Sequence, residues 1–366
     1  MTVTDPALQP LIDRVRAAHA AGAQLEIRGG GTKHFYGETP RGEPFDVTGL
    51  AGISSYEPSE LVVTARCGTR LAELEAALAE HGQCLAFEPP HFGPAATVGG
   101  MVAAGLAGPS RVAVGSVRDY VLGTTLLNGR GEVLSFGGQV MKNVAGYDVS
   151  RLLAGSMGVL GVVLEVSLKV LPVAPATATL RFQLDQAGAL EQLNAWAGQA
   201  LPLNASAWWE DTLIVRLRGA LAAVESAIAR LGGDLIEGEH AVPFWGGLRE
   251  HTDEYFIGAR QAVDAGSAVR LWRLSLPPTA PPLALSGEQL VEWGGSQRWV
   301  CTAAPAAQVR DAATHAGGHA TLFNARDKSP GVFAPLKSPL DRIHRELKKA
   351  FDPSGIFNPD RLYPGL

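Results

Sequence analysis

Apolar residues follow helical spacing near both ends of this chain. Residues 8–21 carry apolar side chains three or four positions apart, which predicts a helix that Gly22 ends. Residues 340–351 repeat the pattern and predict a second helix. The apolar face of this second helix consists of Leu340, Ile343, Leu347 and Phe351.

Runs of β-branched and alternating residues predict strands between these helices. The expected strands cover residues 24–28, 61–66 and 159–171, and Pro172 ends the last of them. Residues 120–127 and 132–136 predict a β-hairpin around a turn that contains Gly129 and Gly131.

Polar residues in front of apolar runs predict further helices. Thr69 is expected to cap a helix that Gly82 closes, and Asp148 a short helix that reaches Leu153. Residues 97–107 predict a glycine-rich helix or turn. Proline-rich residues 172–177 follow as a linker, so the chain is predicted to be α+β with a domain boundary near Leu171.

Composition and charge exclude several classes of protein. Hydrophobic residues make up 46% of the 366 residues, enough for a substantial core. The net charge is −5 and no basic tract occurs, so the electrostatic footprint of nucleic-acid binding is missing. The first ten residues lack the pattern of a signal peptide, and no apolar run approaches the roughly 20 residues of a membrane span. A cytoplasmic protein is therefore expected.

The three cysteines, Cys67, Cys84 and Cys301, lie far apart in the sequence. Without a CxxC pair, neither a thiolate zinc site nor an iron–sulfur cluster is expected from this chain alone, and no metal site is predicted. Such a sparse, odd number fits a reducing compartment better than a disulfide framework.

Glycine is the outlier of the composition, with 43 residues. A strand is expected to lead directly into Arg28-Gly29-Gly30-Gly31-Thr32-Lys33, whose backbone N–H groups could converge on a phosphate. The segment lacks the GK[ST] ending of a P-loop, and His34 stands where a dinucleotide-binding fingerprint needs a third glycine. Taken alone, the segment fits a plain tight turn at least as well.

Four more segments follow in order: residues 97–103, 115–123, 142–148 and 155–162. As an ordered set with the glycine loop, they resemble the FAD domain of the vanillyl-alcohol oxidase family, also called the PCMH-type FAD-binding domain. The resemblance covers residues 23–171. It implies two α+β subdomains that bind FAD over residues 1–172, a cap domain with an antiparallel sheet over 178–335, and a C-terminal return to the FAD domain over 336–366.

The resemblance also implies which residues bind the cofactor. The first loop would hold the pyrophosphate, the middle segments would run along the flavin and its diphosphate, and the last would meet the adenosine and flavin edges. The implied cofactor-binding residues are Arg28, Gly29, Gly30, Gly31, Thr32, Lys33, Pro90, Thr97, Gly99, Gly100, Ser116, Asp119, Tyr147, Gly158, Leu160, Gly161, Val162 and Asn358.

Across nearly the whole chain the sequence is similar to the family of FAD-binding subunits of glycolate oxidase. The motifs that carry this likeness include Glu88-Pro89-Pro90-His91, residues 141–148, Trp293-Gly294-Gly295 and Phe357-Asn358-Pro359. The likeness implies oxidation of glycolate to glyoxylate within a complex that has a larger FAD-containing subunit and an iron–sulfur subunit. Any membrane association would then come through these partners, at the inner face of the membrane.

The residues also bear on how the flavin is held. Some family members attach FAD through a histidine of the first loop or a cysteine before the second segment. Thr32 stands at the first of these positions, and Ala95 and Ala96 at the second. His34 lies two positions late, so a non-covalent FAD is expected.

No catalytic residue is assigned from the sequence. Oxidation of a 2-hydroxy acid needs a cation for the carboxylate, a base for the hydroxyl proton and a flavin as hydride acceptor. The HxGDGNxH-like strand of related dehydrogenases is missing, and His315 with His319 is the nearest substitute. The chain could thus relay electrons for a partner flavin subunit, oxidise the hydroxy acid by itself, or serve assembly only.

For two groups of residues, the sequence leaves two interpretations of their role open. Trp208, Trp209, Trp245 and Trp299 could form a docking face, although such residues more often belong to a core. At the C-terminus, the resemblance implies that Asn358 lies near the flavin ring and Arg361 near its N1–C2 carbonyl edge. A simple turn after Pro359 is the alternative.

Overall fold

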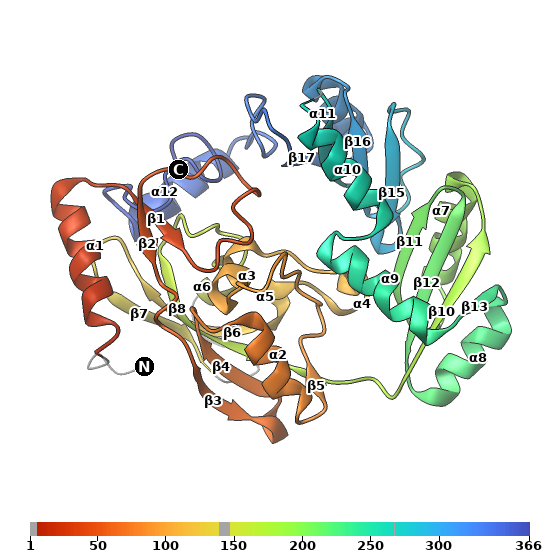
Figure 1. The fold of residues 1–366 in the computed structure, drawn as a ribbon. Coiled ribbons are helices and arrows are strands. Elements are labelled where there is room, and N and C mark those ends of the chain that lie inside the picture. Colours follow the sequence, from red (N-terminus) through yellow and green to blue (C-terminus); the bar gives the residue numbers. More distant parts are fainter. Residues whose placement is uncertain (1–5, 139–146, 267) are drawn as a thin grey trace. The chain divides into compact units, whose positions relative to one another are not determined.

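The chain folds into two units, each built on its own antiparallel sheet (Figure 1). The computed structural model describes residues 6–138, 147–266 and 268–366. Unit 1 consists of Met1–Leu106, Ser116–Pro172 and Pro335–Leu366, and unit 2 of Ala107–Gly115 and Val173–Ala334. The predicted α+β class with antiparallel sheets is confirmed. No helix among the described residues is long and apolar enough to cross a membrane.

Unit 1 contains a five-stranded sheet with the strand order β3-β4-β8-β6-β7 (Figure 1). A separate parallel pair joins β1 to β2, and β5 pairs with β9. The elements of unit 1 are α1 (Gln9–Ala21), β1 (Leu25–Arg28), β2 (Glu43–Asp46), β3 (Ile53–Glu57), β4 (Val62–Arg66), α2 (Leu71–Ala79), β5 (Gln83–Cys84), α3 (Val98–Ala104), α5 (Val117–Tyr120), β6 (Val121–Leu127), β7 (Val133–Gly137), α6 (Val149–Leu152), β8 (Val162–Lys169), β9 (Leu171–Pro172) and α12 (Leu340–Phe351).

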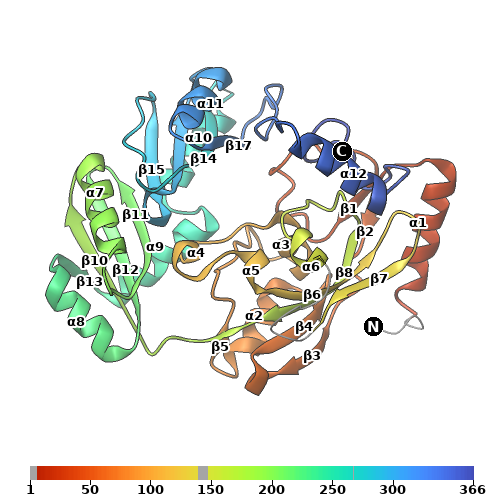
Figure 2. The same cartoon turned by 180° about the vertical axis from the view of Figure 1, so that it is seen from behind.

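Unit 2 contains an eight-stranded sheet with the order β13-β10-β12-β11-β15-β16-β14-β17 (Figure 2). Its elements are α4 (Arg111–Val114), β10 (Ala176–Gln183), α7 (Gln186–Ala197), β11 (Leu203–Trp209), β12 (Thr212–Gly219), α8 (Leu221–Leu231), β13 (Asp234–Ile236), α9 (Gly238–Glu250), α10 (Glu254–Asp264), β14 (Arg270–Ser275), β15 (Glu288–Glu292), β16 (Gln297–Thr302), α11 (Ala306–His315) and β17 (His319–Asn324).

Most of the predicted elements of unit 1 are present. Helix α1 ends at Gly22, which adopts the left-handed conformation that favours glycine, and Asp148 caps α6 by accepting a hydrogen bond from the Arg151 N–H. The capping role of Thr69 was predicted wrongly, because its hydroxyl bonds to both the N–H and the C=O of Gly52. The strand predicted over residues 159–171 begins only at Val162, since residues 157–160 form a turn.

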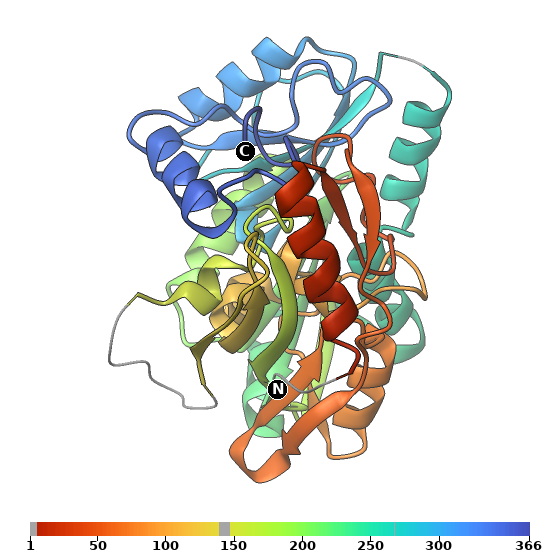
Figure 3. The same ribbon diagram turned by 90° about the vertical axis from the view of Figure 1, so that its left-hand side faces the viewer.

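Helix α1 lies beside the β1–β2 pair (Figure 3), and its apolar side chains belong to one cluster with those strands. Ile12 and Val15 are buried in one cluster with Leu25 and Phe45 of those strands. Phe357 of the C-terminal segment belongs to the same cluster. Leu25 of β1 also forms an isolated parallel β-bridge with Phe357. Strand β1, which leads into the glycine loop, is therefore supported from both ends of the sequence.

Residues 107–115 form an excursion that packs within unit 2, which the sequence did not indicate. Arg216 of β12, which is 4% exposed, forms the hydrogen bonds that hold this excursion. Its guanidinium donates to the Ser110 hydroxyl at 2.7 Å and to Asn204 Oδ1 at 2.7 Å. Trp293 donates to the Gly108 carbonyl, so buried polar bonds attach this loop to the sheet of unit 2.

The tryptophans belong mostly to the core of unit 2, so the docking-face hypothesis for them was wrong. Trp208, Trp245 and Trp299 are buried, and only Trp209 is partly exposed. The apolar face of α12 shows the opposite behaviour, because Leu340 is 51% and Ile343 45% exposed.

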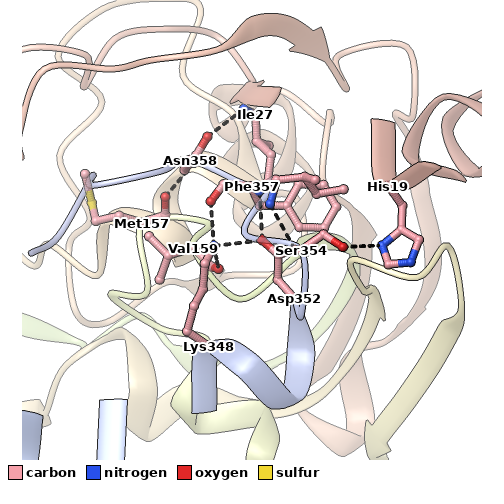
Figure 4. Close-up of polar contacts among 10 residues, drawn as sticks. His19, Ile27, Met157, Val159, Lys348, Asp352, Ser354, Phe357 and Asn358 are labelled. Carbon is pink, nitrogen blue, oxygen red and sulfur yellow. Dashed lines mark hydrogen bonds and ion pairs between the residues drawn. The ribbon is translucent and has the colours of Figure 1, made fainter. Parts of the chain in front are cut away.

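Lys348 of α12 forms a buried ion pair at the end of its own helix and bonds to carbonyls outside the helix (Figure 4). Lys348 Nζ lies 2.7 Å from Asp352 Oδ2 and also donates to the carbonyls of Val159 and Phe357, both at 2.8 Å. Asp352 accepts in addition from the N–H groups of Ile356 and Phe357. All three ammonium protons are thus satisfied, as a buried charge requires.

Substitution of Lys348 by Met should destabilise the chain strongly. The change leaves the Asp352 carboxylate buried without its cation, which costs about 3–5 kcal/mol in comparable pairs. Urea unfolding of the full chain measures this difference. Lys349, the exposed neighbour, supplies the matched control, and Lys349→Met should stay within about 0.5 kcal/mol of the parent. Equal stability of the two variants would contradict the role given to the pair.

Candidate functional site

A pocket in unit 1 is surrounded by backbone segments that lie far apart in the sequence. Its cavity volume is about 110 Å³, within about 880 Å³ of space between atoms that is partly open to solvent. The glycine loop after β1, the N-terminus of α3, the turn before β8 and the C-terminal segment supply its walls. Its lining includes Gly29, Gly30, Gly31, Thr32, Lys33, Thr97, Gly99, Gly100, Gly158, Gly161, Val162 and Asn358.

Glycines are required here because backbone segments approach too closely for a side chain. A Cβ atom at Gly29 would lie 2.5 Å from Thr97 Oγ1, and one at Gly30 would overlap the Ala95 carbonyl oxygen. A Cβ at Gly99 would lie 2.7 Å from Cys67 Cβ. Gly31 has a φ of +70°, a conformation that other residues rarely adopt. The loop and the start of α3 are therefore in direct contact.

The loop presents backbone donors to the pocket. The N–H groups of Gly30, Gly31 and Thr32 have no hydrogen-bond partner within the described ranges. At the second wall, the Thr97 hydroxyl caps α3 by accepting from the Gly100 N–H at 3.2 Å. Converging N–H groups of this kind bind phosphate oxygens, and the arrangement therefore fits a pyrophosphate.

Asn358 connects three walls of the pocket (Figure 4). Its side-chain oxygen accepts from the Ile27 N–H at 2.7 Å, and its amide donates to the Met157 carbonyl at 2.6 Å. The residue is 7% exposed and has a φ of +40°. A Cβ at Gly158 would lie 2.6 Å from its amide nitrogen, so the Asn358 side chain fits only because residue 158 is a glycine.

Arg361 is the most deeply buried cation that lines the pocket. It is 6% exposed and donates through Nη2 to the carbonyls of His34 and Tyr36, at 3.1 and 2.5 Å. Its Nη1 is buried and makes no hydrogen bond with any described residue. Burial lowers the pKa of Arg361 to about 10, which leaves the guanidinium charged at neutral pH. An anion in the pocket would satisfy this donor.

The carboxylate of Glu26 is a second charged group in the lining of the pocket, and it interacts with Arg361. Glu26 Oε1 is 3.2 Å from His34 Nε2 and 3.7 Å from Arg28 Nη2. Partial burial and the two nearby guanidinium groups lower the pKa of His34, against the opposing effect of Glu26, so this imidazole is neutral at pH 7. Glu26 thus partly offsets the positive charge of Arg361 and Lys33 in the pocket.

Six of the residues implied by the family resemblance do not line this pocket. Ser116 and Asp119 form a reciprocal capping box at the start of α5, and Pro90 and Leu160 are buried nearby. The Arg28 side chain contacts Glu26 and His34, and Tyr147 is 96% exposed. The preceding residues of the same motif, 141–146, lie outside the described part of the chain.

The pocket also contains residues that sequence reasoning missed or left undecided. Cys67 and Met157 carry no sequence signal, since each becomes a wall only through the approach of another segment. Burial raises the pKa of the Cys67 thiol to about 12, so this cysteine does not supply a reactive thiolate at neutral pH. Arg361, for which the sequence leaves two interpretations open, lines the pocket.

The comparisons with known proteins agree with this geometry. The profile of the FAD binding domain family matches residues 8–137. The glycolate oxidase subunit GlcE of Escherichia coli (strain K12) is 46% identical over 358 residues, which is 98% of both chains. The chain belongs to the GlcE family. Its N-terminal part is an FAD-binding domain, and FAD is the cofactor that the pocket fits.

More distant relatives share a part of the sequence. A D-lactate dehydrogenase of Archaeoglobus fulgidus is 35% identical over 154 residues, 40% of this chain and 33% of its own. A glycolate oxidase subunit GlcD of Bacillus subtilis is 38% identical over 84 residues, 23% of this chain and 18% of its own. A solved alkyldihydroxyacetonephosphate synthase covers 96% of this chain and 74% of its own at 16% identity, with a TM-score of 0.61, which shows the shared fold.

Substitution of Gly30 by Ala should weaken FAD binding by about tenfold or more. The added Cβ forces the loop away from the Ala95 carbonyl, and such overpacking costs roughly 1–3 kcal/mol. Quenching of flavin fluorescence on titration of the full chain measures the dissociation constant. Gly49→Ala is the control, because Gly49 is exposed and a Cβ there meets no atom within 4 Å. Unchanged affinity in Gly30→Ala would show that the pocket beside the glycine loop does not bind FAD.

Replacement of Arg361 by Met should also lower FAD affinity, by about tenfold to a hundredfold, because a charged hydrogen bond contributes roughly 1.5–3 kcal/mol. Arg361→Lys keeps the charge and should lose less. Arg130→Met, a change at an arginine that is 48% exposed, should bind FAD like the parent. The hypothesis fails if Arg361→Met and Arg130→Met bind FAD equally well.

Proposed function

We propose that this chain is the FAD-binding subunit of a multi-subunit glycolate oxidase that oxidises glycolate to glyoxylate. The observation that supports this best is the end-to-end identity of 46% with a glycolate oxidase subunit, together with a pocket whose glycines and free N–H groups suit a dinucleotide. FAD, when bound, supplies the redox centre that takes up and passes on the electrons of the hydroxy acid.

The residues of this chain have defined tasks in that function. The loop amides hold the diphosphate, and the Arg361 guanidinium compensates a negative charge in the pocket. The deep burial of Arg361 and Asn358 excludes water from that wall. We infer that Arg361 lies at the N1–C2 carbonyl edge of the flavin ring, where a fixed cation favours added electron density. FAD is held without a covalent bond in this proposal, since Thr32, Ala95 and Ala96 cannot form one.

The partner subunits are inferred from where the electrons of the reduced flavin must go. The sequence contains no CxxC pair and therefore no ligand set of its own for an iron–sulfur cluster or a c-type heme. Among the described residues, no group of three metal-ligating side chains occurs. We propose that a larger FAD-containing subunit oxidises glycolate, that this chain relays the electrons, and that an iron–sulfur subunit receives them. Association with the inner face of the membrane would come through these partners.

One observation favours a second candidate function, in which this chain oxidises a 2-hydroxy acid by itself. Arg273 and His319 lie on the paired strands β14 and β17 of unit 2. Partial burial and the nearby Arg273 lower the pKa of His319, so a cation stands beside a neutral imidazole. Oxidation of a 2-hydroxy acid requires a cation that binds the carboxylate and a base that accepts the hydroxyl proton, and Arg273 and His319 are groups of these two kinds. His315, the other histidine of that segment, ends α11 and does not share an element with His319.

Anaerobic addition of glycolate to the purified, FAD-loaded chain distinguishes the two functions. The relay proposal predicts that the flavin absorbance stays unchanged until the larger flavin subunit is added. Bleaching by the chain alone would establish the second function, and its loss in Arg273→Met would assign the clamp. A correctly folded chain that neither contains nor takes up FAD would contradict both and leave an assembly role.

A further inference from the structure

One buried ammonium group bonds to the backbone of two segments that form walls of the pocket in unit 1 (Figure 4). Lys348 Nζ donates to the Val159 carbonyl, in the turn before β8, and to the Phe357 carbonyl, in the C-terminal segment, both at 2.8 Å. Lys348 is 7% exposed and does not line the pocket. It therefore acts on the two walls without meeting a bound cofactor itself.

Each of the two carbonyls adjoins residues that line the pocket. Gly158 directly precedes Val159, and residues 161–162 follow shortly after it. Asn358 directly follows Phe357. The positions of these lining residues are therefore tied to two backbone groups that a single side chain holds together.

The C-terminal wall moves as a unit with Phe357. The Asn358 amide donates to the Met157 carbonyl at 2.6 Å, and the Arg361 N–H donates to the Asn358 carbonyl at 3.2 Å. A displacement of Phe357 would thus carry with it both the Asn358 side chain and the start of the turn that holds Arg361. Both of these residues line the pocket.

Neutralisation of Asp352 accounts for only part of the bonding of Lys348. The ion pair with Asp352 Oδ2, at 2.7 Å, uses one of the three ammonium protons. The other two are donated to the walls, and hydrogen bonds from a charged donor are stronger than those between neutral groups. Burial lowers the pKa of Lys348, and the Asp352 carboxylate opposes that shift. The ion pair thus helps to keep a charged donor between the two walls.

We propose that Lys348 is a positioning residue for FAD, which holds the turn before β8 and the C-terminal segment at the separation where their lining groups meet the cofactor. This inference rests on the FAD site proposed above. Loss of the ammonium frees the Val159 and Phe357 carbonyls, so the two walls are no longer held at one separation. The affinity for FAD then falls although no group that lines the pocket has changed.

Titration of the full chain with FAD, followed by quenching of flavin fluorescence, measures this effect. Lys348→Met should raise the dissociation constant by about tenfold or more, the effect of losing charge-assisted hydrogen bonds. Leu78→Ala is the control for stability, because Leu78 is buried in α2 of the same unit, lies outside the lining, and leaves a cavity in the core when truncated. It should bind FAD like the parent. Equal dissociation constants of the two variants would overturn the proposal.

A double variant separates positioning from stability. Lys348→Met combined with Asp352→Asn leaves no unpaired buried charge, so it should be more stable in urea than Lys348→Met alone. Its affinity for FAD should stay about tenfold below that of the parent, because the two carbonyls remain free. Affinity equal to that of the parent would refute the role of Lys348, and this result can be read even if Lys348→Met alone does not fold.

Hydrogen–deuterium exchange of the FAD-free chain gives a readout that does not depend on the cofactor. In the double variant, amides of residues 157–162 and 357–361 should exchange faster than in the parent, while those of α2 stay unchanged. Unchanged exchange in both segments would contradict the proposal. A parent chain that takes up no FAD would contradict the proposed function, whereas a parent and a Lys348 variant that bind FAD equally well would contradict only the role of Lys348.

Discussion

The pocket that we propose for FAD depends on backbone segments that touch where no side chain has room. The loop after β1 lies against Ala95 and Thr97, and the turn before β8 lies against Asn358. A single Cβ at Gly30 or Gly158 would separate segments that are distant in the sequence. Each glycine loses more conformational entropy on folding than another residue would. The glycines are nevertheless needed here, because only they let several sets of main-chain donors surround one ligand.

The C-terminal segment holds this arrangement together from outside the loops. Lys348 donates to the Val159 and Phe357 carbonyls, and Asn358 bonds to the Ile27 N–H and the Met157 carbonyl. One short segment thus fixes β1, which leads into the glycine loop, and the turn that forms the opposite wall. Lys348 and Asn358 are both 7% exposed, so these hydrogen bonds lie inside the protein.

Sequence reasoning predicted the parts of this structure that local chemistry determines. The helix end at Gly22 and the cap at Asp148 follow from backbone preferences, and the glycine loop was recognised from its position after a strand. Thr69 failed as a cap because a neighbouring loop, absent from any local pattern, offers its hydroxyl better partners. Cys67 could not be predicted as a wall, because only the approach of α3 brings it into the pocket. The excursion of residues 107–115 depends on Arg216, about 100 residues further along the chain.

The charges that line the pocket of unit 1 favour an anion, because Arg361 and Lys33 outweigh Glu26. Two buried polar atoms of this lining make no hydrogen bond with any described residue, Arg361 Nη1 and Glu26 Oε1. The first of these is a donor that a dinucleotide diphosphate would satisfy.

Hydrogen–deuterium exchange of the full chain with and without FAD tests the central claim most directly. If the glycine segments enclose the cofactor, FAD should slow amide exchange in residues 29–33, in 98–101 and in 157–162, and leave the strands of unit 2 unchanged. Slower exchange elsewhere, with those three segments unaffected, would contradict the account.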